Sequence, residues 1–320
     1  MSSIQRIAVL TRDCAGVNAA IRSVVRTAVD EQMSVFGVMK GYEGLIDGSF
    51  ISLDRRSVSG ILNQGGTMLK TARSKRFYTD EGQQQAIDQL HDHKIDAVIV
   101  IGGNGSLSGA FALASKSDIA VMGIPATIDN DVPGVSLSLG SDTALNVAMD
   151  AVDKIRDTAT SLERIFVVEV MGRKSGYIAL KVALAGGCEE VLLPEQSFSV
   201  ERMSDEILKG SKEGKQSWII VVAEGAAKAD EIADQITAKT GLETRVTVLG
   251  HIQRGGRPTA VDRVLAARLG HHTVSLLARG VKNKIVHAND GKLDFFSLDR
   301  ISESKSLPVS EEYKLVKTLL

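Results

Sequence analysis

Three polar residues within a five-residue segment have the types and spacing of a proton-transfer site. Asp129 and Asp131 lie two residues apart, and Thr127 stands two residues before the first acid. A carboxylate can accept the proton of an attacking hydroxyl group, and a second one can support a phosphate-bound metal ion. Acid-rich turns also occur in purely structural loops, so the segment by itself leaves both interpretations open.

Arginine stands next to glycine in two other segments that carry potential ligands. Residues 169–173 read Glu-Val-Met-Gly-Arg, and residues 250–256 read Gly-His-Ile-Gln-Arg-Gly-Gly; Glu224-Gly225 is a shorter segment of the same kind. A guanidinium group can bind phosphate through two parallel hydrogen bonds, and glycine lets a ligand approach the backbone. Together these segments predict a phosphate site, although His251 alone also suits a hydrogen-bonded core imidazole.

Glycine dominates residues 102–106, which read Gly-Gly-Asn-Gly-Ser. Because glycine has no side chain, a phosphate could approach this backbone closely, and Ser106 would cap a following helix. The spacing is neither that of a Gly-x-Gly-x-x-Gly loop nor that of a P-loop. We expect a phosphate-binding turn, with a structural turn as the alternative. The same two interpretations hold for residues 11–16, which precede a helix N-terminus.

Short apolar runs precede these segments and position them. The expected strands are residues 7–10, 35–39, 97–101, 120–124, 165–170, 191–193, 218–223 and 246–249. The expected helices are residues 18–31, 83–91, 142–158, 176–185, 200–210 and 229–240. Nearly all-apolar strands that alternate with helices predict a doubly wound α/β fold with parallel sheets. Ligands of such sheets bind beyond the carboxyl ends of the strands, which is where these segments fall.

The composition is that of a globular intracellular protein. Of 320 residues, 43% are hydrophobic and 24% are charged, and the net charge is -1, so a general affinity for nucleic acid or anionic membrane is not expected. The two cysteines, Cys14 and Cys188, suit reduced thiols and not a disulfide framework. No apolar run approaches the roughly 18 residues of a membrane span. We therefore expect a cytoplasmic location.

The number of strands favours two α/β domains over one. We expect one domain of residues 1–138 and 252–304 and another of residues 139–251 and 305–320, with the turn-rich stretch 133–140 at the boundary. The tail beyond residue 290 is poorly periodic, and its pattern predicts no particular element.

Together these segments resemble the ATP-dependent 6-phosphofructokinase family of the bacterial type. The matching strings are Gly65-Gly66-Thr67 with Ala72-Arg73, and residues 127–131, 168–173 and 249–256. The resemblance runs from residue 7 to residue 270. It implies two Rossmann-like domains and a homotetramer with active sites shared between subunits. It also implies transfer of phosphoryl from ATP, with Mg²⁺, to the 1-hydroxyl of fructose 6-phosphate.

The resemblance assigns a role to each matched residue. Asp129 is expected to be the general base, while Thr127 and Arg173 position the substrate and stabilise the transferring phosphoryl group. Arg164 and Arg245 are expected to reach the 6-phosphate from an adjacent subunit, and Asn104 and Asp131 to serve the metal. The other expected sugar-phosphate contacts are Met171, Gly172, Glu224, His251 and Arg254. The expected nucleotide contacts are Arg73, Ser74, Gly103, Asn104, Gly105 and Ser106.

An allosteric site is also implied. Arg22 and Arg26 lie four residues apart, on one face of the first expected helix. Such a basic cluster would bind the phosphates of ADP or phosphoenolpyruvate, although solvated helix faces carry such residues too. The expected effector contacts are Arg22, Arg26, Arg55, Arg156, Glu189, Lys212 and Lys215.

Two residues depart from the family's pattern on the nucleotide side. Arg12 stands in a shortened loop where the family has glycines, and Asn104 stands where it usually has an aspartate that serves Mg²⁺. Two alternatives therefore stay open: a catalytically weak regulatory subunit, and a pyrophosphate-dependent enzyme. Gly105 and Ala126 favour ATP, because pyrophosphate-dependent relatives typically carry aspartate and lysine at these positions.

Overall fold

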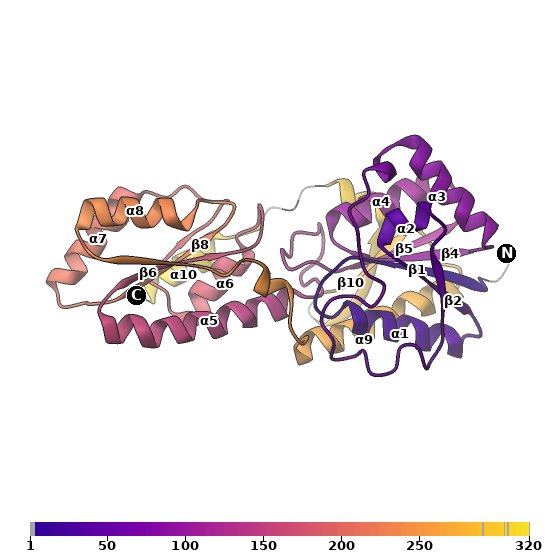
Figure 1. Cartoon of the computed structure of the whole chain (residues 1–320), viewed down its shortest axis with the longest axis horizontal. Coiled ribbons are helices and arrows are strands. Elements are labelled where there is room, and N and C mark those ends of the chain that lie inside the picture. Colours follow the sequence, from indigo (N-terminus) through magenta and orange to yellow (C-terminus); the bar gives the residue numbers. More distant parts are fainter. Residues whose placement is uncertain (1–3, 290, 304, 306, 320) are drawn as a thin grey trace. The chain divides into compact units, whose positions relative to one another are not determined.

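The computed structural model describes residues 4–289, 291–303, 305 and 307–319 (Figure 1). Its strands are β1 (Arg6–Thr11), β2 (Ser34–Val38), β3 (Phe50–Leu53), β4 (Ala97–Gly102), β5 (Ala120–Pro125), β6 (Ile165–Val170), β7 (Glu190–Leu192), β8 (Trp218–Ala223), β9 (Thr244–Val248), β10 (Lys284–Asn289) and β11 (Lys292–Ser297). Its α-helices are α1 (Val17–Asp30), α2 (Gly41–Ile46), α3 (Asp80–Asp92), α4 (Asn104–Lys116), α5 (Ser141–Leu162), α6 (Tyr177–Gly186), α7 (Val200–Lys212), α8 (Ala229–Thr240), α9 (Ala260–Ala278) and α10 (Ser310–Thr318). Short 3₁₀ helices lie at Arg76–Tyr78, Gly250–Arg254 and Leu298–Ser302.

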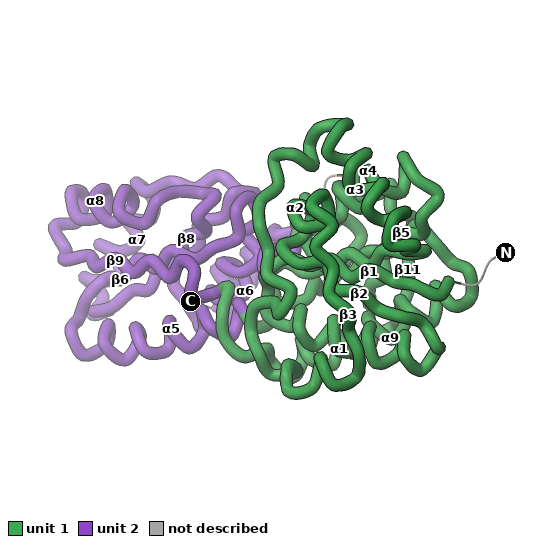
Figure 2. The backbone as a smooth tube through the Cα atoms, turned by 45° about the vertical axis from the view of Figure 1, so that its right-hand side comes forward, with its two compact units in different colours: residues 1–127, 131–143, 254–305 green, residues 128–130, 144–253, 306–320 purple. Residues whose placement is uncertain are grey.

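The chain divides into two compact α/β units (Figure 2). Unit 1 holds residues 1–127, 131–143 and 254–305, and unit 2 holds residues 128–130, 144–253 and 306–320. The expected boundary at 138/139 differs from the observed crossing at 143/144, because the first turn of α5 belongs to unit 1. Residues 128–130 belong to unit 2, although the residues on both sides of them belong to unit 1, and the sequence does not predict this crossing.

Unit 1 is built on a seven-stranded sheet in the order β11-β10-β5-β4-β1-β2-β3. The expected parallel arrangement holds in its interior, where β4 and β5 are buried along their whole length. It is wrong at both edges, since β3 and β11 are antiparallel to their neighbours. The strand order reverses between β1 and β4, so the loops that follow these two strands flank the switch point where ligands of such sheets bind.

Unit 2 contains a four-stranded parallel sheet in the order β7-β8-β6-β9. All residues of β6 and β8 are buried, as their apolar runs predict. The expected strand at 246–249 is wrong in extent and in burial. Strand β9 begins at Thr244, ends before Leu249 and stays half-exposed, because it is an edge strand with one neighbour.

Side-chain caps fix where several helices begin. The hydroxyl oxygens of Thr79, Ser199 and Thr259 accept hydrogen bonds from backbone N–H groups in the first turns of α3, α7 and α9. Each such cap contributes about 1 kcal/mol to helix stability. Helices α2, α9 and α10 are not among those expected from the sequence, whereas a helix after the glycine-rich segment was expected and is α4. The expected cap at Ser106 is wrong, because α4 begins at Asn104 with Gly103 at the N-cap position, and Ser106 lies inside its first turn.

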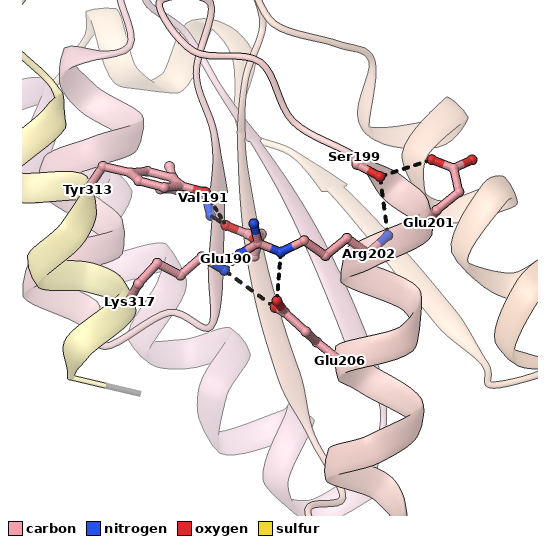
Figure 3. Close-up of polar contacts among 8 residues, drawn as sticks. All are labelled: Glu190, Val191, Ser199, Glu201, Arg202, Glu206, Tyr313 and Lys317. Atoms are coloured by element: carbon pink, nitrogen blue, oxygen red, sulfur yellow. Dashed lines mark hydrogen bonds and ion pairs between the residues drawn. The ribbon is translucent and has the colours of Figure 1, made fainter.

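A polar cluster fastens the C-terminal helix α10 to unit 2 (Figure 3). Lys317 forms ion pairs with Glu190 and Glu206, and Glu206 also pairs with Arg202 at 2.9 Å. The Tyr313 hydroxyl donates to Glu190 at 3.4 Å, and burial raises the pKa of Tyr313 to about 12. These long-range contacts explain why a weakly patterned tail forms a defined helix.

Over the described residues, none of the helices is both long enough and apolar enough to cross a lipid bilayer.

Candidate functional site

The loop after β6 is shaped by Glu224, the first residue after the neighbouring strand β8. Glu224 accepts hydrogen bonds from the backbone N–H groups of Gly172 at 3.2 Å and Arg173 at 2.8 Å. Arg173 adopts the left-handed backbone conformation, with φ of 54°. A Cβ on Gly225 would lie 1.8 Å from the Arg173 carbonyl oxygen, so only glycine allows this approach. Glu224 therefore acts here as a support of the loop that presents Arg173.

Asp129 is brought to this loop from a distant part of the sequence. Its Oδ2 lies 3.7 Å from Nε of Arg173, and the Asp129 side chain is 5% exposed while that of Arg173 is 63% exposed. Asn130, the next residue, has a φ of 48°, which turns the chain sharply after the acid. A nearly buried carboxylate can take the proton of a hydroxyl group that attacks a phosphoryl group. An accessible cation beside it can stabilise the negative charge of that phosphoryl group during the transfer.

The segment after β9 completes this edge of the sheet in unit 2. Gln253 is fully buried, and its side-chain oxygen accepts from the Met171 backbone N–H at 3.4 Å. His251 is exposed, which argues against the core-imidazole alternative. Arg254 is half-buried and is assigned to unit 1. The expected residues Met171, Gly172, Arg173 and Glu224 are thus brought together around the ends of β6 and β8.

Arg164 and Arg245 lie at the opposite end of the same sheet. They stand at the amino ends of β6 and β9, which pair with Ile165 opposite Thr244. Strand β6 has six residues, so Arg164 and Arg173 are separated by roughly 17–20 Å along it. Both arginines pair with Glu243, Arg164 at 2.8 Å. Within one chain the structure therefore does not bring these arginines to Asp129.

In unit 1 the loops after β4 and β5 pack closely. A Cβ on Gly103 would lie 3.1 Å from Cβ of Thr127, so glycine permits the approach of the threonine. Thr127 is held by a backbone hydrogen bond to Leu139 at 3.0 Å. Gly105 is exposed, and a Cβ there would meet no atom within 4 Å. These two loops leave an accessible backbone surface next to the hydroxyl of Thr127.

Asn104 and Asp131 are neighbours in unit 1. The Asn104 side-chain amide donates to the Asp131 carbonyl oxygen at 3.2 Å. Its own oxygen, Oδ1, is buried without a hydrogen-bond partner among the described residues. Lys305 lies near Asp131, and burial lowers the pKa of this lysine while the charge of Asp131 opposes that effect. An unsatisfied amide oxygen beside an acid suits a hard cation such as Mg²⁺.

Arg73 and Ser74 lie in an irregular segment before α3. Arg73 is exposed. The Ser74 hydroxyl accepts from the Phe77 backbone N–H at 3.1 Å. A hydrogen bond from Ser74 is also the main cause of the lowered pKa of Glu43, followed by one from Arg76. Ser74 thus has a structural role that the sequence did not indicate.

The expected effector residues separate into two groups. Arg22, Arg26 and Arg55 belong to unit 1, whereas Arg156, Glu189, Lys212 and Lys215 belong to unit 2. In unit 2, Glu189 pairs with Lys215 at 3.1 Å, and Arg156 donates to the Gly186 and Gly187 carbonyl oxygens at 2.6 and 2.8 Å. Cys188 lies near both Arg156 and Glu189, and burial raises the pKa of its thiol to about 12. Lys212 is exposed.

Two residues that support the site were missing from the expected set. Glu243 holds Arg164 and Arg245, and Gln253 holds Met171. Gln253 stands within the matching string of residues 249–256, but the sequence alone gave it no role. Its complete burial in the structure indicates that it supports the site. Over the described part of the chain, no three His, Cys, Asp or Glu side chains gather into a metal-binding group.

In comparison with known proteins, the chain is similar to phosphofructokinases. The family model described as Phosphofructokinase matches residues 6–277. The chain is 49% identical over 300 residues to the ATP-dependent 6-phosphofructokinase of Listeria innocua, covering 91% of this chain and 94% of that protein. It is 47% identical over 318 residues to the enzyme of the same name from Shouchella clausii, covering 99% of both. The structure of phosphofructokinase from Saccharomyces cerevisiae superposes with a TM-score of 0.84 at 33% identity, over 98% of this chain and 46% of that longer chain.

Proposed function

Since the chain belongs to the phosphofructokinase family, we propose that it transfers the terminal phosphoryl group of ATP to the 1-hydroxyl of fructose 6-phosphate. The products are fructose 1,6-bisphosphate and ADP. The observation that carries this proposal is the pair formed by the nearly buried Asp129 and the exposed Arg173, in a chain whose relatives are named as ATP-dependent enzymes.

Asp129 is the general base of this proposal. Its carboxylate takes the proton of the 1-hydroxyl as that oxygen attacks the phosphoryl group. Arg173, 3.7 Å away, stabilises the negative charge of the transferring group, and Thr127 orients it. The hydrogen bonds from Gly172 and Arg173 to Glu224 support this role, because they fix the loop on which Arg173 stands.

The sugar phosphate would be bound by residues of two subunits. Met171, Gly172, Glu224, His251 and Arg254 would contribute from the chain that supplies Asp129. Arg164 and Arg245 would contribute from a neighbouring copy, as part of a homotetramer. Their position at the far end of the unit 2 sheet supports this assignment, since within one chain they stand roughly 17–20 Å from Arg173 along β6, away from the site built around Asp129.

The nucleotide would lie on unit 1, against Arg73, Ser74, Gly103, Asn104, Gly105 and Ser106. Asn104 and Asp131 would hold Mg²⁺, and the unsatisfied Oδ1 of Asn104 supports this assignment. When bound, Mg²⁺ would neutralise negative charge on the phosphates of the donor. The residues grouped as Arg22, Arg26, Arg55, Arg156, Glu189, Lys212 and Lys215 would bind a phosphorylated effector such as ADP or phosphoenolpyruvate, in a cytoplasmic enzyme.

A coupled assay tests the proposal. Fructose 6-phosphate is supplied with either ATP or pyrophosphate, each with Mg²⁺, and formation of fructose 1,6-bisphosphate is followed. We expect turnover with ATP and negligible turnover with pyrophosphate. Faster turnover with pyrophosphate at equal concentration would overturn the choice of donor. Retained binding of fructose 6-phosphate without turnover from either donor would instead indicate a regulatory subunit.

A further inference from the structure

Arg12 leaves β1 at the switch point of the unit 1 sheet. Its backbone N–H donates to the Ile101 carbonyl oxygen of β4 at 3.0 Å, which extends the pairing of the two strands by one residue. Its side-chain stem passes over Gly102, where a Cβ would lie 3.2 Å from Cγ of Arg12. The start of the side chain is therefore fixed by the end of the neighbouring strand.

The guanidinium group of Arg12 reaches a third segment of unit 1. Nη1 donates to the Ala72 carbonyl oxygen at 3.1 Å and to Oγ1 of Thr71 at 3.4 Å. Residues 71–73 have no regular secondary structure, so no strand or helix ladder holds their backbone. The carbonyl group that accepts from Arg12 belongs to the peptide bond that leads to Arg73. A hydrogen bond from a charged group to this carbonyl restrains the peptide bond between Ala72 and Arg73. It thereby restrains the backbone from which the Arg73 side chain extends.

The family resemblance places glycines at the position of Arg12, so this contact belongs to the present chain and not to the family's pattern. We propose that Arg12 is a positioning residue for the phosphoryl donor: it acts by holding Ala72, and thereby Arg73, in place for the donor's phosphates. This inference rests on the proposed function, in which Arg73 and the loop after β4 bind ATP. It makes Arg12 a residue that aids nucleotide binding and not one that fills the nucleotide's space.

Single substitutions in the full-length protein test the inference. Arg12→Met keeps an unbranched stem but removes the cation, and Arg12→Lys restores a charged donor of shorter reach. We measure KM for ATP, KM for fructose 6-phosphate, kcat, and calorimetric binding of a non-hydrolysable ATP analogue. Arg12→Met should raise KM for ATP and Kd for the analogue about tenfold, as expected for loss of one charge-assisted hydrogen bond. The kcat and the KM for fructose 6-phosphate should stay within about twofold, and Arg12→Lys should recover most of the affinity.

A double-mutant cycle separates positioning from a general loss of stability. If Arg12 acts through Arg73, then Arg12→Met should change analogue binding by less than about twofold in an Arg73→Ala background. Arg279→Ala is the matched control, because Arg279 is an exposed arginine on the surface of unit 1. Thermal unfolding of every variant is recorded. If Arg12→Met melts below the assay temperature, Arg12→Gln takes its place, with an intermediate loss of affinity expected.

The outcomes distinguish this inference from the proposed function. Unchanged or tighter analogue binding by Arg12→Met, or full additivity with Arg73→Ala, would overturn the role of Arg12 while parental turnover with ATP remained. Analogue binding that depends on Arg12 in a protein that fails to turn over would support the inference while the proposed function fell. Absence of analogue binding by the unsubstituted protein would overturn the inference.

Discussion

Arg164 and Glu243 form an ion pair, with Nε and Oε2 2.8 Å apart, where β6 and β9 begin. The same carboxylate also pairs with Arg245. One acid thus holds two guanidinium groups together on the surface of unit 2. Two cations held close are a suitable receptor for a dianionic phosphate, which can compete with the acid for both of them.

Arg164→Ala and Arg245→Ala should each raise the KM for fructose 6-phosphate far more than the KM for ATP. Loss of one charge-assisted contact costs roughly 1.5–3 kcal/mol, or about 10- to 150-fold in affinity. Steady-state kinetics with each substrate varied in turn measures the effect. Arg202→Ala is the control, because Arg202 also pairs with an acid on the surface of unit 2. Equal changes in both KM values would argue against a contact with the sugar phosphate.

Mixing two impaired variants should restore part of the activity when fructose 6-phosphate is kept well below the raised KM of Arg164→Ala. If the site is shared as proposed, Arg164→Ala would damage the site in the neighbouring copy, whereas Asp129→Asn would damage the site that the chain itself builds. Dissociation and reassembly of the two variants therefore creates some sites with both residues intact. Activity is compared with that of each variant reassembled alone. Verified mixed oligomers without recovered activity would contradict sharing of the site between subunits.

Asp129→Asn should lower kcat by about 10²–10⁴-fold, the usual contribution of a general base. The amide keeps the shape of the side chain, so binding of fructose 6-phosphate should change little. Asp150→Asn is the control, since Asp150 is an exposed acid paired with Lys154 on α5. A kcat within threefold of the parent value would exclude Asp129 as the base.

The buried parts of both sheets could be predicted from the sequence, because a strand covered on both faces must be apolar throughout. Strands β4, β5, β6 and β8 are of this kind. The edge strands β3 and β11 could not be predicted in this way, since one side of each is exposed and their patterns are mixed.

Candidate site residues could be chosen from the motifs because their types follow from phosphate chemistry; the structure brings Gly172, Arg173 and Glu224 together, and their roles stay predictions. The residues that hold the candidate site residues in place were harder to predict from the sequence. The contact between Glu243 and Arg164 depends on the register of β6 with β9, which no local pattern specifies. The contact of Arg12 with Ala72 joins residues 60 positions apart along the chain and requires the fold itself.

Asn104→Asp should tighten the apparent affinity for Mg²⁺, because a carboxylate is a better ligand for a hard cation than an amide. The position is suitable, since Oδ1 of Asn104 is buried and unsatisfied beside Asp131. Two titrations check this: activity against Mg²⁺, and thermal stability against Mg²⁺ with ADP present. An unchanged or weaker affinity would mean that residue 104 does not face the metal.

Asp262→Asn should destabilise the protein in a pH-dependent way. Asp262 is fully buried, and its carboxylate accepts from the Gly140 and Thr143 backbone N–H groups at 2.8 and 2.9 Å. Burial raises the pKa of this carboxyl group in the folded state. Its contribution to stability is therefore fully present below the ordinary aspartate pKa of about 3.9 and is lost as pH rises through the raised value. The cost of the substitution, about 1–3 kcal/mol for the broken hydrogen bonds, should thus be larger in mild acid than at neutral pH.

Asp54→Asn provides a control of opposite sign for this pH dependence. Hydrogen bonds from the Ser57 backbone N–H, and then from other groups of the same turn, lower the pKa of Asp54. Its contribution is present above the ordinary aspartate pKa and disappears as pH falls, so this substitution should cost more at neutral pH than in acid. Urea unfolding of the parent and both variants, at several pH values between about 4 and 8, measures the two differences. A cost of Asp262→Asn that grew toward neutral pH would show that the folded protein favours the ionised form of this buried acid.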